Sequence, residues 1–128
     1  MKYKQLLFVL CLGLLLLSVP FARAQIVRSG EFICDAPLVT GLCPVAVLNW
    51  TVGGQPISGS GDSWGCGNTH NTLQPGQANG WRLDISSQGI DCASIIICSK
   101  SHSFHAGDPQ SFKVQCNLGR SKFTFSLR

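Results

Sequence analysis

Apolar residues recur at every second position in several short segments, a pattern typical of β-strands with one buried face. In residues 80–87 this alternation places Trp81, Leu83 and Ile85 on one face. No helical pattern follows residue 24. The sequence therefore predicts an all-β domain, with alternating strands at residues 26–33, 44–52, 80–87, 111–116 and 122–127.

Three further segments depart from simple alternation. Residues 93–98 form a continuous apolar run, which predicts a central strand buried on both faces. Residues 117–121 contain Gly119 and separate two alternating strands, so we expect a hairpin there. Residues 53–79 are rich in Gly, Ser, Asn and Pro, and they predict a long loop with one short strand around Trp64.

The N-terminal segment has the features of a secretory signal peptide. A short start with two lysines precedes an apolar run from Leu6 to Phe21, and Ala22 and Ala24 provide the small residues that a signal peptidase accepts. We expect residues 1–24 to be removed and residues 25–128 to form one secreted domain without a membrane span. The predicted location is extracellular.

Removal of this segment changes the charge argument. The full chain has a formal net charge of +4, but loss of Lys2, Lys4 and Arg23 leaves seven basic against six acidic residues, a net charge of +1. A nucleic-acid or acidic-membrane partner needs a clustered basic excess. Composition therefore predicts neither partner.

The cysteines predict a domain held together by disulfides. Cys11 lies in the signal segment, and the expected secreted domain keeps six cysteines: Cys34, Cys43, Cys66, Cys92, Cys98 and Cys116. An even number in a small secreted chain indicates three bridges, whose pairing spacing alone does not decide. If residues 93–98 are extended, Cys92 and Cys98 stand roughly 20 Å apart and do not bond to each other.

We predict no metal or cofactor. The chain has no Cys-x-x-Cys pair, and although His102 and His105 have ligand-like spacing, an exposed loop pair accounts for them better. The fold class that follows is a small disulfide-stapled antiparallel β-sandwich or barrel.

An alternative within this class comes from a partial resemblance to immunoglobulin-like sandwiches. The positions that carry the resemblance lie between the first and fifth of the expected cysteines: Cys34, Gly41, Val47, Trp50, Gly54, Ile57, Leu83, Ile85 and Cys98. Ile96 stands where that family has a tyrosine, two residues before the second cysteine. The resemblance thus implies a sandwich without identifying a family.

Two patterns in the sequence invite a catalytic interpretation. Gly61 to Gly65 satisfies the Gly-x-Ser-x-Gly pattern, but that motif works on a strand-to-helix turn of a large α/β sheet, which this chain lacks. The chain is also similar in length to small β-rich fungal-type ribonucleases, which use histidines and a glutamate. The candidates here would be Glu31, His70, His102 and His105. Neither pattern forms a recognisable catalytic set, and nucleic acid is a substrate only in the ribonuclease alternative.

Candidate binding residues follow from the irregular segment. Trp50 and Trp81 fall at alternating strand positions and belong to the core, whereas we expect Trp64 to be partly exposed and, with His70, to contact a partner. Asn49 begins an Asn-Trp-Thr glycosylation sequon.

The function predicted from sequence is that of a secreted, cysteine-rich, non-enzymatic binding protein. Its gross composition resembles that of effector-, toxin- or defence-like proteins, and its partner would be an extracellular or cell-surface protein or glycan. The alternative is a small secreted hydrolase, with ribonuclease first.

Overall fold

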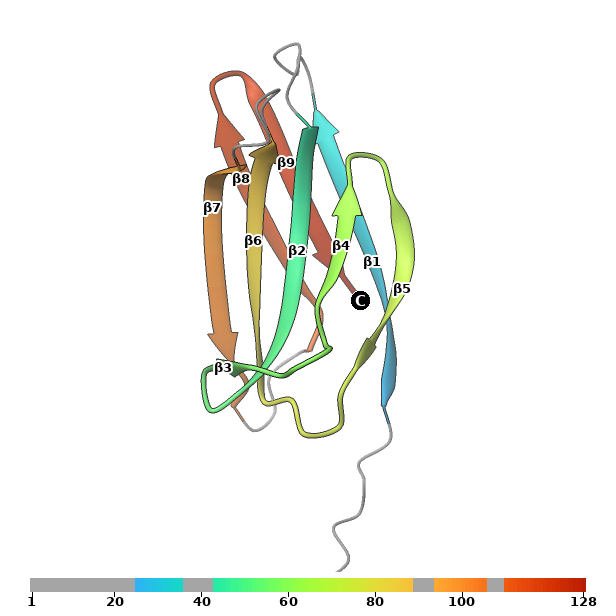
Figure 1. Ribbon diagram of the computed structural model, residues 1–128. Coiled ribbons are helices and arrows are strands. Elements are labelled where there is room, and N and C mark those ends of the chain that lie inside the picture. Colours follow the sequence, from blue (N-terminus) through green and yellow to red (C-terminus); the bar gives the residue numbers. More distant parts are fainter. Residues whose placement is uncertain (1–24, 36–42, 89–93, 106–109) are drawn as a thin grey trace, which may run out of the picture.

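Nine β-strands, all antiparallel to their neighbours, make up the part of the chain that the structure describes (Figure 1). The structure is a computed structural model, and it describes residues 25–35, 43–88, 94–105 and 110–128. The expected signal segment, residues 1–24, lies outside the described residues. None of the described residues belongs to a helix long and apolar enough to cross a bilayer.

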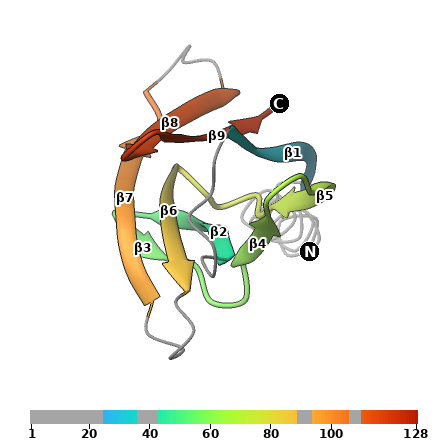
Figure 2. The same cartoon turned by 90° about the horizontal axis from the view of Figure 1, so that it is seen from above.

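The strands form two packed sheets, which Figure 2 shows as two layers seen from above. Sheet A has the order β5 (Thr69–Gln74), β1 (Ile26–Asp35), β9 (Ser121–Leu127), β8 (Phe112–Leu118). Sheet B has the order β3 (Gln55–Pro56), β2 (Cys43–Val52), β6 (Gly80–Gln88), β7 (Ser94–Ser103), and β4 (Asp62–Gly65) also pairs with β2. The predicted all-β sandwich is confirmed.

The core lies between the sheets and follows the alternation of the sequence. Trp81, Leu83 and Ile85 of β6 point inward, as predicted, and Trp50 lies opposite Trp81 across the β2–β6 pair. Sheet A contributes the inward side chains Phe32, Val114, Cys116, Phe123, Phe125 and Leu127. Burial of these large apolar side chains, each worth about 1.5–3 kcal/mol, drives the two sheets together.

The predicted hairpin between the last two strands is confirmed. Leu118 pairs with Ser121, so Gly119 and Arg120 form a two-residue turn. Gly119 has a φ of 60°, which glycine adopts without the penalty that a Cβ would bring.

The short strand expected around Trp64 is confirmed as β4, but the expectation that the rest of residues 53–79 forms a long loop is wrong, because β3 and β5 also lie there. Alternation did not reveal β5 because its inward positions, His70, Thr72 and Gln74, are polar. Thr72 and Gln74 are nevertheless buried. A strand with a polar inner face gives no hydrophobic period to detect.

The expectation of a central strand at residues 93–98 is also wrong. β7 pairs with β6 alone and forms an edge of sheet B, where Ile95 and Ile96 are 61% and 60% exposed. The register shifts between Ile85 and Ser86, so that Ile97 is left without a partner opposite it and packs against the core instead. A continuous apolar run therefore marks a strand here but not its place in the sheet.

Two disulfides join the described strands. Cys34–Cys66 ties β1 to the turn after β4, and Cys98–Cys116 ties β7 of sheet B to β8 of sheet A. Cys98 is thus not bonded to Cys92, as the strand geometry required. Cys34 and Cys98, the two cysteine positions of the immunoglobulin-like pattern, have other partners, so that pattern's bridge does not form. The bridges indicate an oxidising environment.

The third predicted bridge leads to a testable assignment. Cys43 is exposed, has no disulfide to a described residue, and lies opposite Gln88 at the end of β6. Of the expected six cysteines, Cys92 is then its remaining partner, and it lies outside the described residues. Peptide mapping without reduction should recover a Cys43–Cys92 linked peptide, whereas alkylation of Cys43 in the native protein would contradict the assignment.

Candidate functional site

Trp64, one of the two predicted binding residues, is fully buried, so the expectation that it is partly exposed and contacts a partner is wrong. Its indole stacks on the His70 ring at 4.3 Å between ring centres and meets the edge of Phe125 at 4.9 Å. Alternation along β4 turns Trp64 inward, opposite Ala46 on β2. The indole packs between the two sheets and is not available to a partner.

Gly30 makes room for this indole. It lies opposite His70 on the β1–β5 pair, and a Cβ at Gly30 would come within 2.5 Å of Trp64 Cζ2. Real Cβ atoms essentially never approach so closely. The close packing of β1 against Trp64 therefore depends on a glycine at this position.

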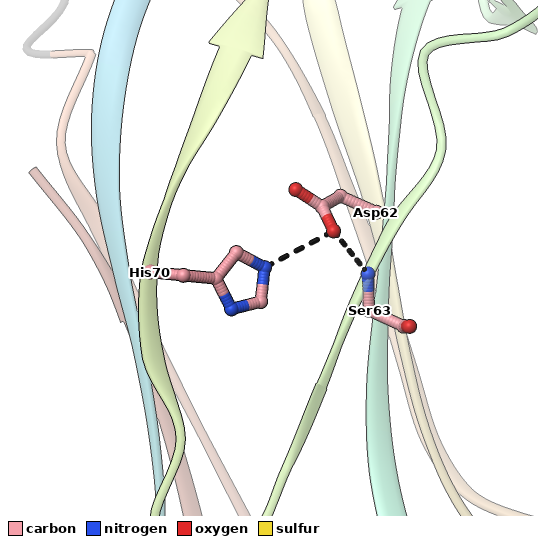
Figure 3. A network of polar contacts seen from close by, with 3 residues as sticks. All are labelled: Asp62, Ser63 and His70. Carbon is pink, nitrogen blue, oxygen red and sulfur yellow. Dashed lines mark hydrogen bonds and ion pairs between the residues drawn. The ribbon is translucent and has the colours of Figure 1, made fainter.

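His70, the other predicted binding residue, is paired with a carboxylate. Its Nε2 lies 3.1 Å from Asp62 Oδ1, and the Ser63 backbone N–H donates to the same oxygen at 2.8 Å (Figure 3). Burial by itself raises the pKa of Asp62. Hydrogen bonds with His70, Ser63 and Thr72 and the nearby imidazole charge lower the pKa by more than burial raises it, so the net pKa is below the usual value. The Asp62–His70 pair connects β4 to β5 beside Trp64.

The pair does not complete a catalytic triad. Ser63 contacts Asp62 through its backbone N–H, and because neighbouring strand residues point to opposite faces, its exposed side chain turns away from the inward-facing Trp64. The Gly-x-Ser-x-Gly residues lie on and beside a short strand, and no strand-to-helix turn holds them.

The candidate ribonuclease residues do not converge either. His70 is on β5, at one edge of sheet A, whereas His102 and His105 lie on and after β7, which packs beside β8 at the other edge (Figure 1). Glu31 is exposed between the buried residues Gly30 and Phe32, so it faces away from the side on which His70 meets Trp64. His102 and His105 lie 6.2 Å apart between ring centres.

The lowered pKa of Asp62 gives a prediction for acid stability. A carboxylate whose folded pKa is depressed stabilises the fold above its unfolded pKa of about 3.9, and this stabilisation is lost as the pH falls through the lower folded value. Asp62→Asn should therefore destabilise the domain by about 1 kcal/mol near neutral pH, and the difference from wild type should shrink toward pH 2.

Thermal melts of both proteins across pH 2–7 measure this difference. Asp35→Asn, at the exposed end of β1, is the matched control and should follow wild type throughout. A constant difference between Asp62→Asn and wild type from pH 7 to pH 2 would contradict the pKa argument.

Comparison with known proteins adds no family to this picture. No protein-family model matches the chain, and no curated protein is significantly similar to it.

A polar groove lies on the outer face of sheet B, away from the core. Three cross-strand rows form this part of the face: Thr51, Gly80 and Ser103 in the first, Asn49, Arg82 and Ser101 in the second, Val47, Asp84 and Ser99 in the third. Asp84 lies beside the groove, next to Arg82 and Ser99, which line it. The cavity measures about 290 Å³ and is lined by Thr51, Gly54, Trp81, Arg82, Ser99, Ser101, His102 and Ser103. We call it the Gly80 groove.

Gly80 is packed closely between Thr51 and Ser103, two residues that line the groove. A Cβ there would lie 2.6 Å from the His102 carbonyl oxygen and 2.7 Å from Thr51 Oγ1. Any side chain at this position would therefore have to displace the β7 backbone and the Thr51 side chain.

A charge pair borders the hydroxyl groups of the groove. Arg82 Nε lies 3.2 Å from Asp84 Oδ2, and the Ser99 hydroxyl donates a hydrogen bond to Asp84 Oδ1. The Arg82 side chain is about half exposed. One cation, one anion and several hydroxyls thus share a surface that can both donate and accept hydrogen bonds.

The sequence prediction did not include this site, although the alternation of Trp81, Leu83 and Ile85 leaves Arg82 and Asp84 on the opposite face of β6. The serines at positions 99, 101 and 103 alternate too, and this was the available signal. Only the β6–β7 register, with its bulge, places them beside Arg82 and Asp84.

The possible glycosylation site, Asn49, lies within β2 next to this surface. Asn49 is half-buried, Trp50 is fully buried and Thr51 is 5% exposed. The sequon is therefore part of a packed strand, and its occupancy stays a prediction.

Proposed function

We propose that this protein is a cysteine-rich binding protein that acts outside the producing cell, in the manner of effector-, toxin- or defence-like proteins, and that the Gly80 groove is its recognition site. The observation that carries the proposal is the groove itself, because it gathers hydrogen-bond donors and acceptors from β2, β6 and β7 around one hollow.

The rigidity of the surrounding scaffold supports this proposal. Cys98–Cys116 ties β7, one wall of the groove, to sheet A, and the floor strand β6 is paired on both sides. A site held on ordered strands loses little conformational entropy when it binds. The groove therefore needs no rearrangement to receive a partner.

The arrangement of the titratable groups favours binding over catalysis. General acid–base chemistry needs two groups within reach of one substrate, and His70 is paired with Asp62 on the far side of the sandwich from His102 and His105. The Asp62–His70 pair is the one observation that favours the alternative, a small secreted hydrolase with ribonuclease first.

One experiment separates the two functions. The purified domain is immobilised and incubated with extracellular and cell-surface extracts, and the amount of each captured partner is compared among wild type, Arg82→Ala and Ser101→Trp. Lys122→Ala, exposed on β9 in sheet A, is the control. We expect the amount of captured partner to fall at least ten-fold for both groove variants and to stay unchanged for the control.

A parallel nuclease assay uses wild type and His70→Ala. Cleavage of RNA by wild type that disappears in His70→Ala would overturn the binding proposal in favour of the hydrolase. Capture that is equal in all four proteins would remove the groove from the proposed function.

A further inference from the structure

We infer that the Gly80 groove binds a single neutral sugar residue of a glycan. This inference rests on the proposed function and names the partner class of the same site. It follows from three properties of the groove: its hydrogen-bonding groups, its charge balance and its size.

The hydrogen-bonding groups match those of a sugar ring. The hydroxyls of Thr51, Ser101 and Ser103 can each donate and accept, as the hydroxyls of a sugar do, whereas the Ser99 hydroxyl donates to Asp84 and is left to accept. Arg82 is a donor only and Asp84 an acceptor only when ionised, and the two are held side by side at 3.2 Å. Of two neighbouring sugar hydroxyls, one can therefore accept a hydrogen bond from Arg82 while the other donates a hydrogen bond to Asp84.

The charge balance selects against ionic ligands. Arg82 and Asp84 neutralise each other, so a phosphate, sulfate or carboxylate attracted to Arg82 would also approach the Asp84 carboxylate. A cation attracted to Asp84 would likewise approach the positively charged Arg82 guanidinium. A neutral ligand rich in hydroxyls has no such conflict, which makes a neutral sugar the ligand class that fits.

The size of the groove limits the ligand to one ring. A volume of about 290 Å³ is just below the roughly 300–1,000 Å³ that pockets for drug-sized molecules occupy. The groove is on the outer face of a sheet, so the rest of a glycan chain can extend into solvent. Recognition of a single residue on a longer chain is consistent with this geometry.

The aromatic residues near the groove indicate that a single groove binds a sugar weakly. Trp81 is 6% exposed and its ring stacks on Phe112 at 3.8 Å, so it offers little free face to a sugar ring. Binding then depends on hydrogen bonds that replace hydrogen bonds to water, so each of them adds little net affinity. Multivalent presentation is therefore the appropriate way to detect it.

The test measures binding of the domain to surfaces that carry neutral sugars (glucose, galactose, mannose, N-acetylglucosamine) or anionic ones (sialic acid, glucuronic acid, sulfated galactose) at high density. We expect wild type to bind at least one neutral sugar and none of the anionic ones. Binding should change less than two-fold between 50 and 500 mM salt, because no net charge is neutralised.

The variants locate the binding in the groove. Arg82→Ala, Asp84→Asn and Ser101→Trp should each weaken it at least ten-fold, while Lys122→Ala should leave it unchanged. Melting temperatures show whether each variant is folded. Should Asp84→Asn fail to fold, Ser101→Trp still tests the site, because Ser101 is exposed and its replacement fills the groove from outside.

Each outcome decides between the two proposals. Salt-sensitive binding to anionic sugars alone would overturn the neutral-sugar inference. Failure to bind any sugar, together with capture of a protein partner that Ser101→Trp abolishes, would overturn the inference and leave the proposed function intact. Failure of both measurements to respond to the groove variants would overturn both.

Discussion

Trp64→Ala should destabilise the domain by about 3–5 kcal/mol, because it removes a fully buried indole and leaves a cavity between the sheets. The indole is in contact with His70 and Phe125, and the Gly30 backbone closes the other side. For a domain of this size the melting temperature should fall by roughly 10 °C or more.

Two further variants separate loss of packing from loss of a specific group. Trp64→Phe keeps an aromatic ring and removes an indole N–H that has no hydrogen-bond partner among the described residues, so it should cost less than half as much. Gly30→Ala introduces a clash with the same indole and should also destabilise. A melting temperature of Trp64→Ala within 2 °C of wild type would contradict the buried position.

Reduction of the disulfides should unfold the domain at ordinary temperature. Chain-entropy arguments assign about 4 kcal/mol to Cys34–Cys66, with a sequence separation of 32, and about 3 kcal/mol to Cys98–Cys116, with a separation of 18. The two loops do not overlap in sequence, so these contributions add. Their total is comparable with the roughly 5–15 kcal/mol stability of a whole small domain.

Thermal melts with and without a phosphine reductant measure this effect. The paired variants Cys34→Ala with Cys66→Ala, and Cys98→Ala with Cys116→Ala, assign it to one bridge or the other. Loss of the Cys34–Cys66 bridge should be the more damaging, because it closes the longer loop. A cooperative melt that reductant does not shift would show that the core alone is sufficient.

The Asp62–His70 pair and the Gly80 groove illustrate two different kinds of chemistry on one scaffold. The pair lies at the β4–β5 side of the sandwich and stabilises the packing of Trp64, whereas the groove lies on the outer face of sheet B. Variants at His70 should therefore alter stability without altering recognition, and variants at Ser101 the reverse.

Local patterns in the sequence determined most of the strands. The alternation of Trp81, Leu83 and Ile85 fixed the inward face of β6, and Gly119 marked the last hairpin. These features depend on neighbours along the chain, through the two-residue period of a strand and the φ preference of glycine. The even cysteine number likewise indicated disulfides, of which the described residues contain two.

Tertiary structure alone decided where those strands lie and which side chains meet. The apolar run of β7 became a sheet edge, Trp64 became buried although glycines surround it in sequence, and Cys34 bonded to Cys66. The Gly80 groove arises the same way, because the register of β2, β6 and β7 sets Thr51 and Ser103 on either side of Gly80. Register and sheet order depend on contacts between residues far apart in the chain, and no local pattern encodes them.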